Sequence, residues 1–253
     1  MKKLIPLSLL LVLVLPALPV FAQHGAAPPA PQDAAGANPF EFSVQGVFRD
    51  MVQRRDFESK TTLAAAIGAG ATEGVGALSG LRGEVTIVQG RAVVTCGSRA
   101  TCARAEGESA TLLATAKARA WGQPMALPAD MGNGELGDFI DSQARARGLS
   151  LSQPFPLRVV GALANVRMHV VSAPNPKFAG HGAAEPMAIQ DEEFERDLDG
   201  EVVGVRVPPS VRGVATHPGE AFHFHWVDTA RTRTAHLDEF RVKAGALLLL
   251  PLP

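Results

Sequence analysis

Three of the chain's seven histidines lie close together near its C-terminal end, in the stretch HFHWVDTARTRTAH at residues 223–236. In a β-strand, side chains two positions apart point to the same face, so His223 and His225 would project together. His236 follows at the interval at which a hairpin brings the next strand back alongside. Three converging imidazoles with one coordination position left open are typical of a catalytic zinc or other divalent-metal site. Exposed histidines on an ordinary amphipathic strand are the alternative, because the spacing alone is only moderately specific.

Several segments predict the strands and helices that would position these side chains. GLRGEVTIVQGRAVVTC alternates on either side of Gln89-Gly90, which indicates a hairpin with a tight turn and places Glu84, Thr86 and Val88 on one face. KTTLAAAIGAGA predicts a short helix capped by Thr61 or Thr62. ELGDFIDSQARARG has apolar residues at helical spacing and ends on a glycine, so it predicts a longer helix. Further strands are expected at 110–121 and in these segments: FPLRVVGALANVRMHVV, EVVGVRV, AFHFHWVD, AHLDEFRV and ALLLLPLP.

The expected fold class is therefore α+β and strand-rich, with a mixed β-sheet in the N-terminal half packed against a largely antiparallel, barrel-like C-terminal half. Residues 1–22 have the pattern of a secretory signal peptide, with Lys2 and Lys3 before an apolar run that ends in Val20-Phe21-Ala22. Residues 23–39 are rich in Ala, Pro and Gly and predict a flexible tether. The domain would then cover 40–253, in two halves of about 40–150 and 151–253.

The charge balance and the cysteine content indicate which binding partners and which cellular compartment to expect. The chain has 24 Lys plus Arg against 25 Asp plus Glu, so it has no basic surplus that would attract nucleic acid or anionic lipid. After cleavage of the signal peptide no membrane association is expected, and the protein would be periplasmic or secreted. In such an oxidising compartment Cys96 and Cys102 are expected to form a disulfide within a hairpin loop.

Four blocks of the chain, in order, resemble the α-acetolactate decarboxylase family: GALSGLRGEVTIVQGRAVV, VVGALANVRMHVV, DGEVVGVRVP and HFHWVDTARTRTAH. The resemblance implies that His223, His225 and His236 hold Zn²⁺ or another divalent transition metal. It also implies removal of carbon dioxide from 2-acetolactate, or a related 2-hydroxy-3-keto acid, to give acetoin. Glu84 matches the family's carboxylate at the metal, where it would donate the proton that completes the product or act as a further ligand.

The chain departs from the family pattern in three places. The family has an arginine eight residues after the glycine that matches Gly161, where it pairs with the substrate's carboxylate; His169 stands there, with Arg167 two residues earlier on the same strand face. The family places another acidic residue at the site after the strand of the third histidine, while this sequence ends in LLLLPLP. Two extra residues precede the first histidine in HPGEAFHFH. Histidine is mostly neutral near pH 7, so it is no equivalent of arginine.

Two hypotheses follow. One is an exported metal-dependent decarboxylase in which Arg167 or His169 lies near the small-molecule substrate. The other is a non-catalytic periplasmic metal- or ligand-binding protein that keeps the three-histidine cage. Three further histidines, His24, His181 and His217, lie in the predicted tether or in predicted loops, and we interpret them as solvent-exposed. The sequence leaves open the identity of the metal and whether the protein forms a homodimer.

Overall fold

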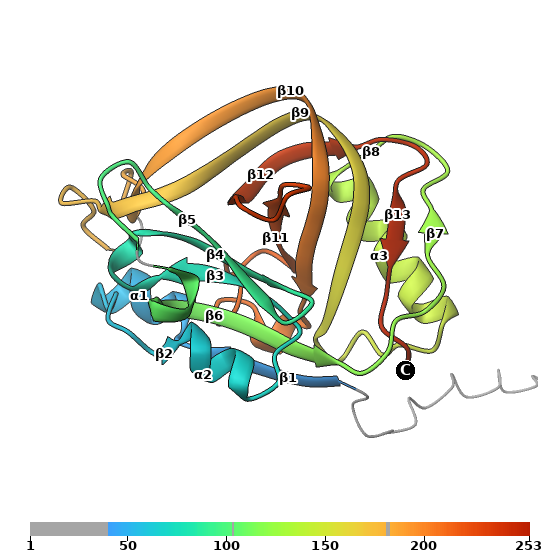
Figure 1. Ribbon diagram of the computed structural model, residues 1–253, viewed down its shortest axis with the longest axis horizontal. Coiled ribbons are helices and arrows are strands. Elements are labelled where there is room, and N and C mark those ends of the chain that lie inside the picture. Colours follow the sequence, from blue (N-terminus) through green and yellow to red (C-terminus); the bar gives the residue numbers. More distant parts are fainter. Residues whose placement is uncertain (1–39, 103, 181–182) are drawn as a thin grey trace, which may run out of the picture. The chain divides into compact units, whose positions relative to one another are not determined.

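The computed structural model describes residues 40–102, 104–180 and 183–253. The predicted signal peptide and tether lie outside this part, as does His181. The expected strand-rich α+β fold class is confirmed, because two β-sheets contain more of the described residues than the helices do, and three α-helices pack beside them (Figure 1). None of the helices in the described ranges is long and apolar enough to cross a bilayer.

The first sheet has six strands in the order β1-β6-β3-β4-β5, with β2 paired to β6. Its strands are β1 (Phe40–Gln45), β2 (Thr61–Thr62), β3 (Glu73–Leu78), β4 (Gly83–Val88), β5 (Arg91–Cys96) and β6 (Ser109–Ala118). Helices α1 (Phe48–Arg54) and α2 (Leu63–Gly68) belong to the same part of the chain, as do the 3-10 turns η1 (Ser79–Leu81) and η2 (Ala105–Gly107). The predicted cap of α2 is present, since the Thr62 hydroxyl accepts a hydrogen bond from the Ala65 N–H at 3.1 Å.

The second sheet has seven strands in the order β7-β13-β9-β10-β11-β12-β8. Its strands are β7 (Met125–Ala126), β8 (Met131–Gly132), β9 (Phe155–Pro174), β10 (Ala188–Arg206), β11 (Phe222–Val227), β12 (Thr234–Val242) and β13 (Leu247–Leu249). Helix α3 (Asn133–Ala146) and the 3-10 turn η3 (Pro209–Val211) complete the described elements. Because β12 also pairs with β9, the strands β9, β10, β11 and β12 form a closed circuit, which is the expected barrel-like half.

Two details of the expected architecture need correction. The sheet of the N-terminal half is antiparallel in the pairings of all its named strands, rather than mixed. The boundary between the halves also falls earlier than residue 150, because β7 and β8 are strands of the second sheet and α3 buries Leu136 and Ile140 in the core of that half. The chain therefore passes from one sheet to the other between residues 118 and 125.

Strands β9 and β10 form one long antiparallel ribbon that bends sharply (Figure 1). Gly161 on β9 and Gly200 on β10 are direct cross-strand partners within the ribbon. A Cβ atom on Gly200 would lie 2.2 Å from the indole nitrogen of Trp226, so only glycine permits this close approach. Both arms of the ribbon belong to the closed circuit, because β10 pairs with β11 at 201–206 and β9 pairs with β12 at 163–169. The second arm carries His169 and Gln190.

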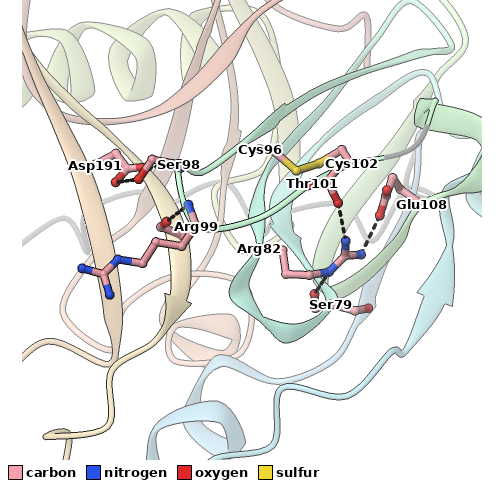
Figure 2. Close-up of a disulfide and its surroundings, with 10 residues drawn as sticks. Ser79, Arg82, Cys96, Ser98, Arg99, Thr101, Cys102, Glu108 and Asp191 are labelled. Atoms are coloured by element: carbon pink, nitrogen blue, oxygen red, sulfur yellow. Dashed lines mark hydrogen bonds and ion pairs between the residues drawn. A yellow bond between two sulfur atoms is a disulfide. The ribbon is translucent and has the colours of Figure 1, made fainter.

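The β4–β5 hairpin and the pairing of the two cysteines are as expected, but the disulfide lies in the connection between β5 and β6, which do not pair, rather than in a hairpin loop. Gln89 and Gly90 both have positive φ, 50° and 74°, as a two-residue hairpin turn requires. Cys96 and Cys102 form a disulfide with their Cα atoms 5.8 Å apart. The loop that it closes contacts the long ribbon, since the Ser98 hydroxyl donates to Asp191 at 2.8 Å (Figure 2).

Apolar side chains join the two sheets. One buried cluster contains Val75 and Val88 from the first sheet together with Val203, Val205 and Val227 from the second. A larger cluster fills the space between α3 and the second sheet. These packed clusters fix the two sheets against each other, and the histidine-rich face of β11 and β12 meets the polar face of β4 at their contact.

Candidate metal centre

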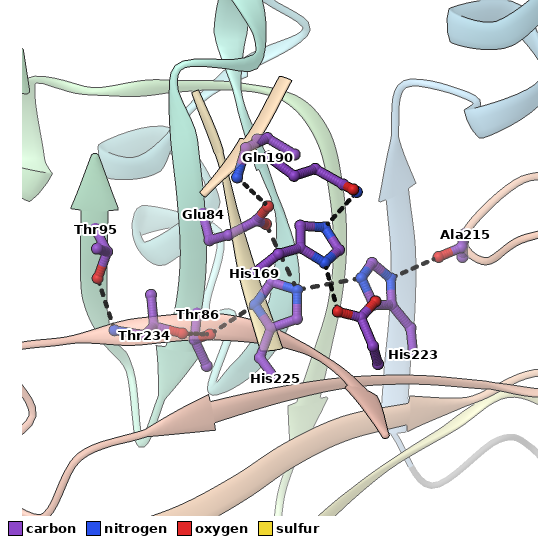
Figure 3. A network of polar contacts seen from close by, with 11 residues as sticks. Glu84, Thr86, Thr95, His169, Gln190, Ala215, His223, His225 and Thr234 are labelled. Carbon is purple, nitrogen blue, oxygen red and sulfur yellow. Dashed lines mark hydrogen bonds and ion pairs between the residues drawn. The ribbon is translucent and has the colours of Figure 1, made fainter. Parts of the chain in front are cut away.

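The hairpin of β11 and β12 brings the three predicted metal ligands together. His225 and His236 are direct cross-strand partners, and His223 lies two residues from His225 on the same face. One nitrogen from each of His223, His225 and His236 lies within 4.8 Å of the others. The ring centroids of His223 and His236 are 5.0 Å apart. Figure 3 shows how the rings of His223 and His225 point toward each other. The three imidazoles therefore converge as the sequence predicted.

Burial keeps these imidazoles neutral. Desolvation lowers the pKa of His223 to about 4 and holds the pKa values of His225 and His236 well below the usual histidine range. His225 is fully buried, at 0 % exposure. Neutral imidazole is the form that binds a transition metal, so the cluster offers lone pairs at pH 7 without releasing protons.

Hydrogen bonds orient the rings so that their free nitrogens face a common point. The Nδ1 of His223 lies 2.9 Å from the Ala215 carbonyl oxygen and must donate to it, which leaves Nε2 as a lone pair. The Nδ1 of His225 lies 3.0 Å from the Thr86 hydroxyl. The two Nε2 atoms are only 3.1 Å apart. Because its Nδ1 donates, the Nε2 of His223 can only accept, and it accepts from an Nε2–H of His225 in the tautomer whose Nδ1 accepts from Thr86. In the other tautomer of His225, with the proton on Nδ1, both Nε2 atoms offer lone pairs, and this donor set fits a divalent cation.

Glu84 lies beside the histidine cluster, on the face of β4 that the alternation of the hairpin predicted. Its side chain is 3 % exposed, and its Oε2 is 3.7 Å from the Nε2 of His225. The backbone N–H of Val171 donates to Oε1 at 3.2 Å. Desolvation raises the pKa of the Glu84 carboxyl to about 7, against the opposing charge of His169. Glu84 can therefore carry a proton at neutral pH, which an ordinary surface glutamate cannot.

His169 is held at the site by two polar partners. It faces His236 across the β9–β12 pairing, with ring centroids 4.8 Å apart, and it is 8 % exposed. Its Nδ1 lies 2.9 Å from Asp238 Oδ2, and its Nε2 lies 3.0 Å from the side-chain amide nitrogen of Gln190. Burial opposes the charged form, but the hydrogen bond with Asp238 and the charge of Glu84 outweigh it and raise the pKa of His169.

Arg167 reaches the cavity wall but is already paired. Its guanidinium donates to Glu239 at 2.7 Å, and 37 % of its side chain is exposed. This ion pair also raises the pKa of Arg167, so the side chain keeps its charge at every working pH. Of the two candidates for the position near the substrate's carboxylate, His169 is thus the buried one and Arg167 lies toward the rim.

Asp238 is the site residue that the sequence reasoning missed. In β12, Leu237 pairs with Met168 and Glu239 with Arg167, so Asp238 is the extra residue of a β-bulge. The Asn133 side chain holds the bulge, because its amide nitrogen donates to the Asp238 carbonyl at 2.9 Å. The bulge leaves the Asp238 carboxylate at His169. The only signal in the sequence was its position two residues after His236.

A cavity of about 840 Å³ opens over these groups. The polar residues at the histidine end of its wall are Glu84, His169, Gln190, His223, His236 and Asp238. His225 lies behind this wall, fully buried. His217, predicted to be a solvated loop residue, is exposed but also lines the cavity, where its ring lies 4.2 Å from the centroid of Phe48.

Comparisons with known proteins identify the family through a family model and the fold through solved structures. The family model described as alpha-acetolactate decarboxylase matches residues 47–250. An alpha-acetolactate decarboxylase from Bacillus subtilis strain 168 has a similar structure, with a TM-score of 0.65 and 14 % identity over 84 % of this chain and 86 % of that one. The acetolactate decarboxylase of Bacillus subtilis subspecies spizizenii gives 0.68 and 15 % over the same shares.

A third similar structure is a Staphylococcus aureus protein of unknown function that is described as similar to alpha-acetolactate decarboxylase. It gives a TM-score of 0.60 and 19 % identity, over 83 % of this chain and 84 % of that one. No curated protein sequence matches this chain. At these identities the structural likeness establishes the fold.

Proposed function

We propose that this chain, which belongs to the alpha-acetolactate decarboxylase family, is a metal-dependent carboxy-lyase that acts on a small 2-hydroxy-3-keto acid such as 2-acetolactate. The observation that carries the proposal is the pair of buried imidazole Nε2 atoms 3.1 Å apart beside a carboxyl group whose pKa is about 7. A metal site and a proton donor thus share one cavity wall.

His223, His225 and His236 would hold the metal, with zinc as the expected ion. When bound, the cation would supply Lewis-acid polarisation of the substrate's carbonyl and hydroxyl oxygens. The hydrogen bond from His223 to the Ala215 carbonyl fixes the ring that presents its lone pair to the site. A three-nitrogen set leaves a coordination position for those oxygens.

Glu84 is suited to deliver the proton that completes the product. When the bond between the carboxyl carbon and C2 breaks, carbon dioxide leaves and its bonding electrons pass through C2 to the neighbouring carbonyl oxygen. Protonation of C2 then gives a hydroxyketone, which from 2-acetolactate is acetoin. Burial keeps a proton on Glu84 near neutral pH, and the Val171 N–H holds the carboxyl in one orientation. Its role as a further ligand is the alternative.

His169 and Asp238 would replace the family's arginine in orienting the substrate's carboxylate. In the arrangement described, the Gln190 amide nitrogen donates to Nε2 of His169 and Nδ1–H donates to Asp238, so an imidazolium would offer a charged Nε2–H to the substrate only after the Gln190 amide turns away. A single N–H is a weaker partner than a guanidinium fork. We therefore expect a slower enzyme, or one with a higher KM, than a family member that has the arginine.

We also propose that the protein is exported. The predicted signal peptide supports this, and so does the disulfide between Cys96 and Cys102, because such bonds persist in oxidising compartments. Expression with the native N-terminus, followed by intact-mass measurement of the periplasmic fraction, tests it. Export predicts a mature chain that begins at Gln23, and full-length protein retained in the cytoplasm would contradict it.

The direct test of the lyase is acetoin formation from 2-acetolactate by zinc-loaded protein, with bound zinc measured in parallel. We expect one zinc per chain and turnover that is lost in His225→Ala. His24→Ala, in the predicted tether, is the matched histidine control and should keep both zinc and turnover. Zinc bound by the wild-type chain without any acetoin would refute the lyase and favour the non-catalytic metal-binding protein.

A further inference from the structure

The cavity is larger than a substrate of the size of 2-acetolactate would fill. Liquid water occupies about 30 Å³ per molecule, so 840 Å³ would hold on the order of 25 water molecules. The hydrocarbon substituents of 2-acetolactate are one methyl group on C2 and one on its carbonyl carbon. A substrate of that size, placed between Glu84 and the histidines, would leave most of this volume empty.

One part of the remaining wall is apolar and belongs to one packed cluster, while Arg49, Glu185 and Glu220 are among the polar residues that line other parts. Each member of this cluster is less than 10 % exposed, and each also lines the cavity. The members are Met51, Ala77, Leu81, Leu112, Val171 and Ala188. They come from α1, β3, η1, β6, β9 and β10, so elements of both sheets contribute to one apolar surface. We call this surface the apolar wall.

The apolar wall begins directly beside the acid. Ala77 on β3 is the cross-strand partner of Glu84 on β4, which places the two Cβ atoms about 5 Å apart on the same face. Val171 donates its N–H to Glu84 and also lines the cavity with its side chain. A carbon atom that receives a proton from Glu84 would therefore have its substituents within reach of Ala77 and Val171.

Small side chains keep this end of the cavity open. Ala77 and Ala188 are the two alanines of the apolar wall, and both line the cavity, so a leucine at either position would add volume to this wall. Water confined against such an apolar surface has few hydrogen-bond partners, and replacing it with hydrocarbon is favourable at about 0.8 kcal/mol per buried methylene. The chemistry of the wall thus favours a ligand with a hydrocarbon group.

We propose that the preferred substrate is a 2-hydroxy-3-keto acid in which an extended alkyl chain or a phenyl ring replaces one methyl group of 2-acetolactate, and that the apolar wall binds this group. The inference rests on the proposed function. The reaction stays balanced: the carboxyl group leaves as carbon dioxide, the bonding electrons pass to the neighbouring carbonyl oxygen, and C2 takes the proton of Glu84. Solvent returns a proton to Glu84, and the product is a longer 2-hydroxyketone.

The test is a series of synthetic acids whose C2 substituent lengthens from methyl to pentyl, assayed for carbon dioxide release by the zinc-loaded chain. Each methylene that enters the apolar wall should raise kcat/KM about fourfold, which is equivalent to about 0.8 kcal/mol. Ala188→Leu should lower the pentyl-to-methyl ratio of kcat/KM at least tenfold. Ala162→Leu, on an exposed part of β9, is the matched control and should keep the wild-type ratio.

Binding gives a readout that does not depend on turnover. Calorimetry with unreactive 2-alkyl-2-hydroxy acids, which lack the keto group, should show affinity rising with chain length in the wild-type chain and much less in Ala188→Leu. If 2-acetolactate is the best substrate and affinity is independent of chain length, the inference is overturned while the lyase stands. If long analogues bind but no acid is decarboxylated, the proposed function fails and the apolar binding site is supported.

Discussion

Replacing Glu84 by glutamine separates its role in catalysis from its effect on stability. Glutamine keeps the oxygen that accepts the Val171 N–H but has no acidic proton, so the fold should be retained. Loss of a positioned general acid typically lowers kcat by about 10²–10⁴-fold, which corresponds to about 3–5 kcal/mol in the barrier. The three histidines remain, so bound zinc should stay at one per chain.

The same substitution should stabilise the metal-free protein at alkaline pH. The pKa of Glu84 is raised from 4.5 in the unfolded chain to about 7 in the fold. Between these values the folded state binds more protons than the unfolded state, so wild-type stability falls as pH rises from 4.5 to 7. Glu84→Gln lacks this loss and should be more stable by on the order of 3 kcal/mol at pH 8, with little difference near pH 4.

Glu73→Gln is the matched control for both measurements. Glu73 lies on the neighbouring strand β3, is 0 % exposed, and has its pKa raised by burial to about 8, but it does not line the cavity. Its variant should share the alkaline stabilisation in urea titrations and keep wild-type kcat. If Glu84→Gln loses zinc in proportion to turnover, Glu84 is a ligand, and the reasoning about proton donation is wrong.

Three further outcomes follow from the same contacts. His225→Ala should weaken zinc binding on the order of a hundredfold or more, measured by competition with a chelator, because two imidazoles cannot replace three; unchanged affinity would place the metal elsewhere. Asp238→Asn should lower kcat/KM about 10–100-fold, mainly by raising KM, because His169 loses its charged partner. An unchanged KM would show that His169 does not bind the substrate. Cys102→Ser should lower the free energy of unfolding by about 2 kcal/mol and the Tm by about 4–8 °C, because the loop that the disulfide closes is short. Calorimetry that shows no change in Tm would mean that the disulfide constrains the unfolded chain little.

The parts of the site that depend on local periodicity could be predicted from sequence. Alternation along β4 placed Glu84 and Thr86 on one face, and the Gln89-Gly90 turn fixed the hairpin that presents them. The spacing of His223, His225 and His236 matched the register of a hairpin. In each case neighbouring residues in the chain decide the geometry, because side chains in strands repeat every two residues.

The missed parts depend on contacts between distant segments. The bulge that leaves Asp238 at His169 is held by Asn133, a residue more than a hundred positions away. Gln190 reaches the same ring because β10 begins at Ala188 rather than at Glu201, where the strand EVVGVRV was expected, and it pairs with β9 along its length. The boundary of the halves was placed too late because the helical pattern of α3 does not reveal which sheet it covers. No periodicity within a segment encodes these arrangements.

Zinc-edge X-ray absorption on the reconstituted protein shows whether the three histidines bind the metal. We expect three histidine nitrogens at about 2.0–2.1 Å and one further light-atom position that changes when an unreactive 2-hydroxy acid is added. A metal coordinated by fewer than two histidines, or by a fourth protein ligand that stays in place when the acid is added, would contradict this expectation.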